Sequence, residues 1–367
     1  MNVRTYISVA VVLCVVSVGS AATYVVDPNG SRDFTTIQAA IDAPGTVGGS
    51  RIIVTAGTYR EHINLKGKAI TLSSSDPNDA AVVSATIIDG VGTGRCITFN
   101  SGEDANTVVN GFVITGGHAA GSYPNGFGGG IFCFGSSPTI LNCSISANSS
   151  DSFGGGMGCD TGSSPTLRNC SFTGNSAAEG AAVVAKDSNL TFENCNFTYN
   201  SASQDGGGIS SIYGNNVTVT DCSFTGNSAK AGGGIFSALI NNLTVTNCRF
   251  SANRASLEGG GLRCSANTVT ITNSIFTSNS TNYDGGGISC GSSTTIQDSL
   301  ICGNFHAYSL ASSQISGSYT DKGGNTISDY CPPPRAVTVY HGDLDGDGDV
   351  DFDDVAKLAN NWLSGTH

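Results

Sequence analysis

The chain has 367 residues, including 50 glycines and 13 cysteines, with only 12% charged residues and a formal net charge of −12. Average proteins carry about 7% glycine and about 25% charged residues, so this chain is rich in glycine and poor in charge. The glycines have no three-residue period, which excludes collagen, and 39% hydrophobic residues argue against disorder. The acidic balance offers no basic surface for nucleic acid or an anionic membrane.

The first residues predict a signal peptide over 1–22. Arg4 gives the positive start, an apolar run extends from Ile7 to Val18, and Ser20-Ala21-Ala22 forms a small-residue cleavage site. The run is shorter than the about 20 apolar residues that a membrane-spanning helix needs. We therefore expect an exported protein, secreted or on the cell surface, without a membrane span.

A repeat of about 26 residues fills most of the chain. Its first marker is a Gly-Gly-Gly triplet, found at 128–130, 154–156, 206–208, 232–234, 259–261 and 285–287, with a degenerate copy at 180–182. Its second marker is Asn-Cys-x-Phe or a close variant, as at Asn169-Cys170-Ser-Phe172. Three residues beyond it lies a further asparagine, which recurs at Asn148, Asn175, Asn200, Asn227, Asn253, Asn279 and Asn304.

Each repeat has the pattern of short strands rather than of a helix. Apolar residues alternate with polar ones at Val217 and Val219 and at Cys222 and Phe224. Three short strands cannot bury their own apolar face, so successive repeats must coil and stack. The sequence predicts an all-β parallel β-helix solenoid over residues 23–331, with one coil per repeat.

Stacking predicts columns of equivalent residues, one strand spacing of about 4.7–4.9 Å apart. An inward aromatic column should contain Phe172, Phe197, Phe224, Phe250 and Phe276. The asparagine before each cysteine should adopt a left-handed turn conformation. Its side chain should hydrogen-bond along the column and satisfy buried turn groups.

The cysteines fall on two such columns. One contains Cys143, Cys170, Cys195, Cys222 and Cys248, and the other contains Cys133, Cys159, Cys264 and Cys290. Ala185, Ser211 and Ser237 occupy the second column in between, which favours small buried thiols over a disulfide ladder or a metal site. Cys302 and Cys331 lie outside both columns and are the expected pair if the chain forms one disulfide.

The segment before the repeats combines an amphipathic helix pattern over 33–42 with Gly57-Thr-Tyr59-Arg60-Glu61. It resembles the N-terminal cap and first coils of secreted right-handed β-helix proteins of the pectate-lyase-like superfamily, including pectin methylesterases. The later repeats resemble those of polymorphic outer-membrane proteins. These resemblances imply a right-handed coil closed by a capping helix, and they place the Gly-x-Tyr-x-Glu element in the scaffold.

The sequence predicts no catalytic residue. Gln297-Asp298-Ser299 resembles one catalytic element of the methylesterases, but Asp298 falls on the register of the turn asparagines and the other elements have no counterpart. Gly287-Ile-Ser289-Cys-Gly291 lacks the strand-to-helix context of a nucleophile elbow. Three histidines, His62, His118 and His306, have no serine or cysteine partner in the sequence, so we expect solvated or packing roles.

Acidic residues precede several glycine triplets. They are Asp205, Glu258 and Asp284, with Glu179 before the degenerate copy and Asp151 close to its own triplet. Stacked one strand spacing apart, such carboxylates repel unless water or cations intervene. A solvated turn edge and a cation or sugar site both fit this pattern. The resemblance places a sugar groove along one sheet, so Asp205, Glu258 and Asp284 are our candidate substrate-binding residues.

An acidic segment predicts a calcium module at 342–367, after a linker over 332–341 that begins with Pro-Pro-Pro. Seven of the 28 acidic residues lie between Asp343 and Asp354, without a lysine or arginine. Counted from Asp343, carboxylates and glycine occupy the ligand and turn positions of an EF-hand loop. The predicted calcium ligands are Asp343, Asp345, Asp347, Asp349, Asp351 and Asp354.

The residues after this loop, 355–363, carry a helical apolar stripe that ends at Trp362 and Leu363. Loop and stripe together resemble one half of a type I dockerin. Dockerins carry two such halves and this chain has one. The resemblance implies a cohesin-like partner.

Two functional hypotheses follow. The first is a secreted or surface-associated β-helix protein that binds extracellular polysaccharide or a surface protein and carries a calcium-folded attachment module. The alternative is a polysaccharide lyase or glycosidase, which would need clustered carboxylates or an Arg or Lys base on one sheet face. The low charge density favours the first.

Overall fold

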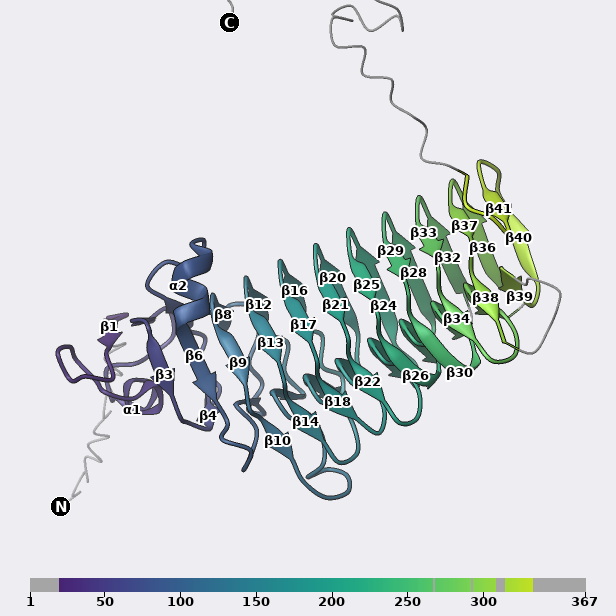
Figure 1. The fold of residues 1–367 in the computed structure, drawn as a ribbon. Coiled ribbons are helices and arrows are strands. Elements are labelled where there is room, and N and C mark those ends of the chain that lie inside the picture. The colour runs from purple at the N-terminus through teal and green to yellow at the C-terminus, as the bar shows by residue number, and fades with distance from the viewer. Residues whose placement is uncertain (1–19, 267, 292, 308–313, 333–367) are drawn as a thin grey trace, which may run out of the picture. The chain divides into compact units, whose positions relative to one another are not determined.

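In the computed structural model, a stack of parallel strands winds in coils along one axis (Figure 1). The structure describes residues 20–332 except 267, 292 and 308–313. The coils lie in the first of two compact units, Met1–Asp329, and the second is Tyr330–His367. Most of the predicted signal peptide and all of the predicted calcium module lie outside the described residues.

The stack has four parallel sheets. The first coils pass from sheet 1 to sheet 2 and directly to sheet 4, and from β10 (His118–Ala119) to β38 (Phe305–His306) each coil also visits sheet 3 between sheets 2 and 4. Sheet 1 contains β1 (Thr23–Val26), β2 (Arg51–Val54), β5 (Thr71–Ser74), β8 (Val108–Asn110), β12 (Thr139–Leu141), β16 (Thr166–Arg168), β20 (Leu190–Glu193), β24 (Asn216–Thr220), β28 (Asn242–Thr246), β32 (Thr268–Thr272), β36 (Thr294–Gln297) and β40 (Tyr319–Asp321). Sheet 2 contains β3 (Gly57–Tyr59), β6 (Thr86–Asp89), β9 (Val113–Thr115), β13 (Ser144–Ser146), β17 (Ser171–Thr173), β21 (Asn196–Thr198), β25 (Ser223–Thr225), β29 (Arg249–Ser251), β33 (Ile275–Thr277), β37 (Leu300–Cys302) and β41 (Thr326–Ser328).

The strands of sheet 3 are mostly two residues long. They are β10 (His118–Ala119), β14 (Ser149–Ser150), β18 (Ser176–Ala177), β22 (Ser201–Ala202), β26 (Ser228–Ala231), β30 (Arg254–Glu258), β34 (Ser280–Thr281) and β38 (Phe305–His306). Sheet 4 contains β4 (Ile63–Asn64), β7 (Ile97–Phe99), β11 (Ile131–Phe134), β15 (Met157–Asp160), β19 (Val183–Lys186), β23 (Ile209–Ile212), β27 (Ile235–Ala238), β31 (Leu262–Ser265), β35 (Ile288–Cys290) and β39 (Ile315–Ser316).

The all-β parallel solenoid is confirmed, with hydrogen-bonded equivalents 25 to 27 residues apart in successive coils. The expectation of three strands per repeat was wrong, because sheet 3 adds a fourth. Its two-residue strands are too short to show an alternation of apolar and polar side chains, so the sequence pattern could not reveal them.

The predicted aromatic column fills the core. The rings of Phe172, Phe197, Phe224, Phe250 and Phe276 are fully buried and lie parallel, with centroids 4.4 to 5.1 Å apart. The strand spacing sets this distance, since each phenylalanine pairs in register with the next. A glycine triplet borders the column in the same coil: a Cβ on Gly208 would lie 2.9 Å from the Phe224 ring.

Two ladders of polar turn residues run beside the core. The turn between sheets 1 and 2 holds the asparagines that precede the cysteines, and Asn169 (φ 54°) donates to Asn142 across 3.0 Å. Asp298 occupies the same turn with φ 49°, as predicted. This ladder is largely exposed, so the prediction that it satisfies buried groups was wrong. The second asparagine of each repeat does that, because Asn148 and its equivalents are at most 2% exposed.

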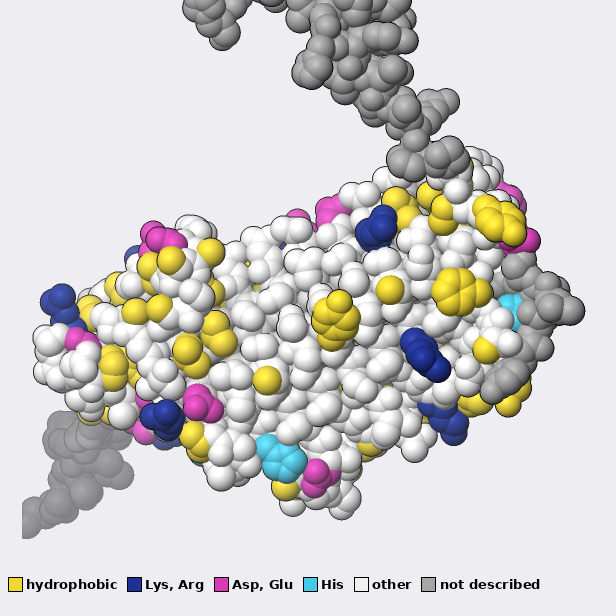
Figure 2. Space-filling model, viewed as in Figure 1, with side chains coloured by type: hydrophobic (Ala, Val, Ile, Leu, Met, Phe, Trp, Pro, Cys, Tyr) yellow, Lys and Arg dark blue, Asp and Glu magenta, His cyan; other side chains and the backbone are white. Residues whose placement is uncertain are grey.

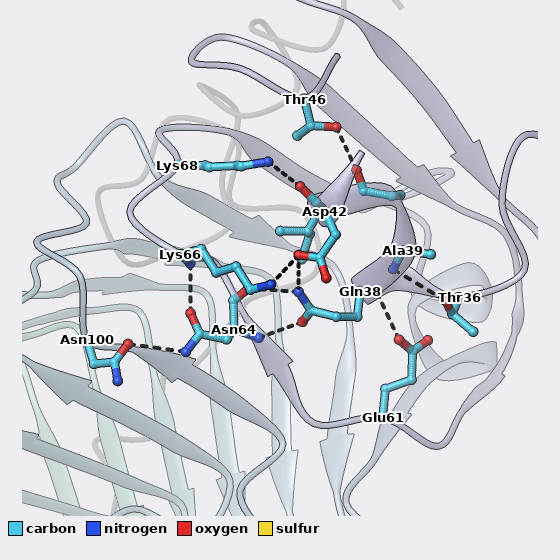
Figure 3. Close-up of polar contacts among 12 residues, drawn as sticks. Thr36, Gln38, Ala39, Asp42, Thr46, Glu61, Asn64, Lys66, Lys68 and Asn100 are labelled. Carbon is cyan, nitrogen blue, oxygen red and sulfur yellow. Dashed lines mark hydrogen bonds and ion pairs between the residues drawn. The ribbon is translucent and has the colours of Figure 1, made fainter. Parts of the chain in front are cut away.

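The predicted capping helix is confirmed as α1 (Ile37–Asp42), which buries Ile37, Ala40 and Ile41. The Thr36 hydroxyl accepts a hydrogen bond from the Ala39 N–H across 3.3 Å. The Glu61 carboxylate accepts from the N–H groups of Ile37 and Gln38, each across 2.8 Å (Figure 3). The Gly-x-Tyr-x-Glu element therefore holds the cap in place.

A second helix, α2 (Ala80–Ala85), packs against β6 and β9 and was not predicted. None of its residues is buried, so it lacks the apolar stripe that would have revealed it. Neither helix among the described residues has the length and apolar composition that crossing a membrane requires.

Candidate functional site

The predicted acidic residues meet along the turn that leads into sheet 4. Parallel bridges join Asp205 to Ala231 and Glu258 to Asp284, and β26 pairs Ala231 with Glu258. Glu179 occupies the same position one coil before Asp205, because the N–H of Gly180 donates to the Asp205 carbonyl. We call Glu179, Asp205, Glu258 and Asp284 the acid column, which Ala231 interrupts once.

Asp151 does not belong to the acid column, contrary to its predicted place. Phe153 occupies that register and bridges to Phe127 on one side and to Glu179 on the other. Asp151 lies two residues earlier, where its Oδ2 accepts a hydrogen bond from the Gly121 N–H across 2.8 Å. Two additional residues between the acid and the triplet are enough to turn the side chain to a different neighbour.

Side chains from sheet 4 surround the acid column. Glu258 forms an ion pair with Arg263, with Nε and Oε2 2.7 Å apart, and accepts a hydrogen bond from Ser289 across 3.1 Å. The Glu179 carboxylate accepts from the Ser210 hydroxyl across 2.7 Å. Burial raises the pKa of Glu179, and the charge of Asp205 adds to the rise. Burial also raises the pKa of Asp205, against the opposing charges of Lys230 and Arg263.

An aromatic cluster continues the same face toward the N-terminus. We give this name to Tyr123, Phe127, Phe132, Phe134 and Phe153. Its central ring, Phe127, lies 5.6 Å from Phe153 and 5.8 Å from Phe132, outside the interior core. The guanidinium carbon of Arg95 lies 4.1 Å from the centroid of Phe132. Tyr123 and Phe134 remain 45% and 38% exposed, so two rings of the cluster face solvent.

Asp160 is a site residue that sequence reasoning missed. It is only 4% exposed although it lies on the outward register of sheet 4, next to Phe134. Its Oδ1 accepts a hydrogen bond from the Thr161 N–H across 2.6 Å, whereas its Oδ2 has no partner among the described residues. The same outward register holds Phe134 in the coil before and Lys186, Ile212 and Ala238 in later coils, so Asp160 is the carboxylate among these positions.

Among the other chemical candidates, Ser289 lies on β35 and donates to Glu258, in no strand-to-helix turn. The Nδ1 of His62 donates to the Arg95 carbonyl in the next coil across 2.8 Å, and its Nε2 lies 3.3 Å from the Thr93 hydroxyl. The expectation that His118 has no serine partner was wrong, because its Nδ1 lies 2.8 Å from the Ser149 Oγ. Their separation of 31 residues hides this contact in the sequence.

The predicted buried thiols are confirmed for both cysteine columns, since all nine column cysteines are free and buried. Cys143 donates to the Leu141 carbonyl across 3.1 Å, and Ser274 makes the equivalent bond across 2.9 Å in a later coil. Cys302 and Cys331 are each disulfide-bonded. Their pairing with one another stays a prediction that non-reducing peptide mapping would test.

Within the described part of the chain, no group of three or more His, Cys, Asp or Glu side chains is arranged to hold a metal ion. The predicted calcium ligands, Asp343 to Asp354, lie outside the described residues. The face in Figure 2 is mostly uncharged, with single basic and acidic side chains widely spaced. The contacts described above make the acid column and the aromatic cluster our candidate ligand surface, along the outer side of sheet 4.

A parallel stack with one coil per repeat defines the class of β-solenoids. Residues 114–203 and 159–328 match the family described as right handed beta helix region. These matches together span more than half of the chain, which therefore belongs to the right-handed β-helix family.

The chain is also similar to one surface protein in sequence and to two solved structures in fold. A cell surface glycoprotein of Methanothermus fervidus is 35% identical over 116 residues, which is 31% of this chain and only 18% of that protein. A pectin methylesterase of Aspergillus niger aligns over 86% of this chain and 91% of its own, at 12% identity and a TM-score of 0.38. The carrot pectin methylesterase aligns over 84% and 88%, at 13% identity and 0.37. Neither of these structural likenesses bears on activity.

Proposed function

We propose that this protein is a secreted or cell-surface β-helix protein that binds extracellular polysaccharide along the outer face of sheet 4. The observation that carries the proposal is the combination of exposed aromatic rings and a column of carboxylates on one face. Aromatic faces offer apolar contact, and carboxylates accept hydrogen bonds from hydroxyl groups. The 35% sequence identity with a cell surface glycoprotein over 116 residues supports a location at the cell surface.

The dimensions of this face favour a polymer over a small molecule. Six strand spacings separate the coil of Phe127 from that of Asp284, a length of about 29 Å. Equivalent positions repeat at each coil, so successive units of a linear chain would meet similar groups. The Oδ2 of Asp160, which makes no hydrogen bond within the described residues, is a further acceptor on this face, close to Tyr123.

Binding of the full chain to a panel of polysaccharides tests this proposal. A variant with Asp205→Asn, Glu258→Gln and Asp284→Asn should bind at least about 10-fold more weakly, and Tyr123→Ala with Phe134→Ala should weaken binding independently. Asp221→Asn is the matched control, because it removes a carboxylate from the exposed turn ladder, where asparagine is the usual residue. Unchanged binding in both sets of variants would contradict the proposal.

We also propose that Asp343, Asp345, Asp347, Asp349, Asp351 and Asp354 bind calcium as a dockerin-like module. Support comes from the sequence alone, through the ligand spacing of an EF-hand loop. A cohesin-like domain is the partner that the resemblance implies. The alternative activity, a polysaccharide lyase or glycosidase, would release reducing ends or unsaturated uronate from the same panel, and the proposed binding function predicts no release.

A further inference from the structure

At the beginning of sheet 3, His118 meets two side chains from the next coil, Ser149 and Asp151. His118 on β10 pairs in register with Ser149 on β14, and the two strands lie side by side (Figure 1). The His118 Nδ1 lies 2.8 Å from the Ser149 Oγ, and its Nε2 lies 3.7 Å from the Asp151 Oδ1. Asp151 is itself positioned, because its Oδ2 accepts a hydrogen bond from the Gly121 N–H.

These contacts place a hydroxyl, an imidazole and a carboxylate in the order that activates a serine. A neutral imidazole that accepts the Ser149 hydroxyl at Nδ1 carries its own proton at Nε2, which faces Asp151. The carboxylate then stabilises the imidazolium that forms when the serine loses its proton. Side-chain exposures of 32% for His118 and 52% for Asp151 leave the group open to a substrate.

A surface pocket adjoins this group. It has a volume of about 490 Å³, and its wall includes His118, His62, Thr93 and Arg95. The Arg95 side chain is fixed by the carbonyls of Phe127 and Pro124, at 2.9 and 2.8 Å, and by the face of Phe132. The pocket therefore offers room for a substrate beside His118, the partner of Ser149, with a positive charge on its wall that two carbonyls hold in place.

The same position in later coils shows that the group is not part of the repeat. Ser149, Ser176, Ser201 and Ser228 form one register column on sheet 3. Ser149 is the member of this column that pairs with a histidine. Arg254 and Phe305 occupy this register in still later coils, so the fold requires neither a serine there nor His118 and Asp151 at one end of the column.

We propose that Ser149 is the nucleophile of a serine hydrolase site for carboxylic esters with a small acyl group, with His118 as general base and Asp151 as its positioning residue. The Ser149 Oγ attacks the acyl carbon while its proton passes to the His118 Nδ1. The bond from the acyl carbon to the alcohol oxygen breaks, and His118 returns the proton to the leaving alcohol. Water then attacks the acyl-enzyme, and His118 carries its proton to Ser149, which releases the carboxylic acid.

Hydrolysis of p-nitrophenyl acetate by the full chain tests the proposal. Ser149→Ala and His118→Ala should each lower kcat/KM at least about 100-fold, and Asp151→Asn should lower it by a smaller factor. Ser176→Ala is the matched control, because it removes the next serine of the same column, and it should leave the rate unchanged. Circular dichroism shows whether each variant retains the β-helix.

Covalent labelling gives a second measurement that does not depend on the choice of ester. A fluorophosphonate should modify Ser149, with the added mass located by peptide mapping, and His118→Ala should abolish the modification. Hydrolysis that survives Ser149→Ala unchanged, or a folded chain whose Ser149 is never labelled, would overturn the proposal. Polysaccharide binding on sheet 4 is measured separately, so the two proposals can fail independently.

Discussion

Asn227 illustrates what one buried amide contributes to this solenoid. Its Oδ1 accepts hydrogen bonds from the N–H and the Nδ2 of Asn200, at 3.0 and 2.9 Å. Its Nδ2 donates to the Phe197 carbonyl and to the Asn253 Oδ1, both at 2.9 Å. Every donor and acceptor of the Asn227 amide therefore has a protein partner. Asn200 and Asn253 in turn use the Asn227 amide as a partner for their own side chains.

We therefore expect Asn227→Ala to lower the free energy of unfolding by more than about 3 kcal/mol, because it leaves several buried donors and acceptors unpaired at once. Denaturant unfolding measures this loss. The control is Asn247→Gly on the exposed ladder, where glycine keeps the positive φ of 53° and water replaces the lost partners. That variant should cost less than about 1 kcal/mol, and equal losses for the two variants would contradict the distinction between the ladders.

The buried thiol of Cys143 makes the stability of the folded chain depend on pH. Burial raises the pKa of its thiol from 9.0 to about 11. Below pH 9 the thiol is protonated in both the folded and the unfolded chain. Above pH 9 the unfolded chain loses this proton first, because its thiol has the lower pKa. Stability should therefore fall as the pH rises from 9 toward 11.

The measurement for Cys143 is a comparison with Cys143→Ser, since Ser274 and Ser299 already occupy this column in later coils. Other groups titrate in the same range and affect both proteins alike. The wild-type chain should lose about 2 kcal/mol more than the variant between pH 8 and pH 10.5. Parallel pH profiles would show that the thiol is accessible to solvent in the folded chain.

At the scale of elements, the Glu61 carboxylate joins the N-terminus of α1 to the first coils. Glu61 accepts hydrogen bonds from two N–H groups at the helix N-terminus, where negative charge is favoured. Glu61→Ala should destabilise the cap by about 2 kcal/mol, and hydrogen exchange should increase in α1 and β1 before it does in later coils. Arg60→Ala is the control, because Arg60 is 69% exposed and its ion pair spans 3.8 Å, so exchange should not change.

The same scale shows what a sequence can and cannot predict for a solenoid. Repeated positions such as Phe224 and Cys222 could be placed from the sequence, because periodicity converts sequence distance into spatial register. Sheet 3 could not, because two-residue strands contain no period. The His118–Ser149 contact could not either, since it joins two coils through a histidine that does not recur in the repeat.

At the scale of the whole molecule, regularity and function occupy different residues. The columns of Phe, Cys and Asn satisfy the requirements of stacking, and they would do so in any chain with this repeat. Asp160 and His118 depart from the repeat, because no neighbouring coil has the same residue at their registers. Sites in this protein are therefore best sought where a coil differs from its neighbours.

The charge distribution of the whole chain leads to its last prediction. Asp343 to Asp354 supplies −7 of the net −12, so the rest of the chain is nearly neutral. Calcium added to the metal-free chain should shift the fluorescence of Trp362, the single tryptophan, because ligand carboxylates that repel one another are brought together only by the cation. Chelation should reverse the shift, and Asp343→Asn with Asp345→Asn should abolish it, whereas Asp205→Asn should leave it intact. An unchanged emission at millimolar calcium would show that this segment is an acidic tail, and the β-helix would then account for all of the specific binding.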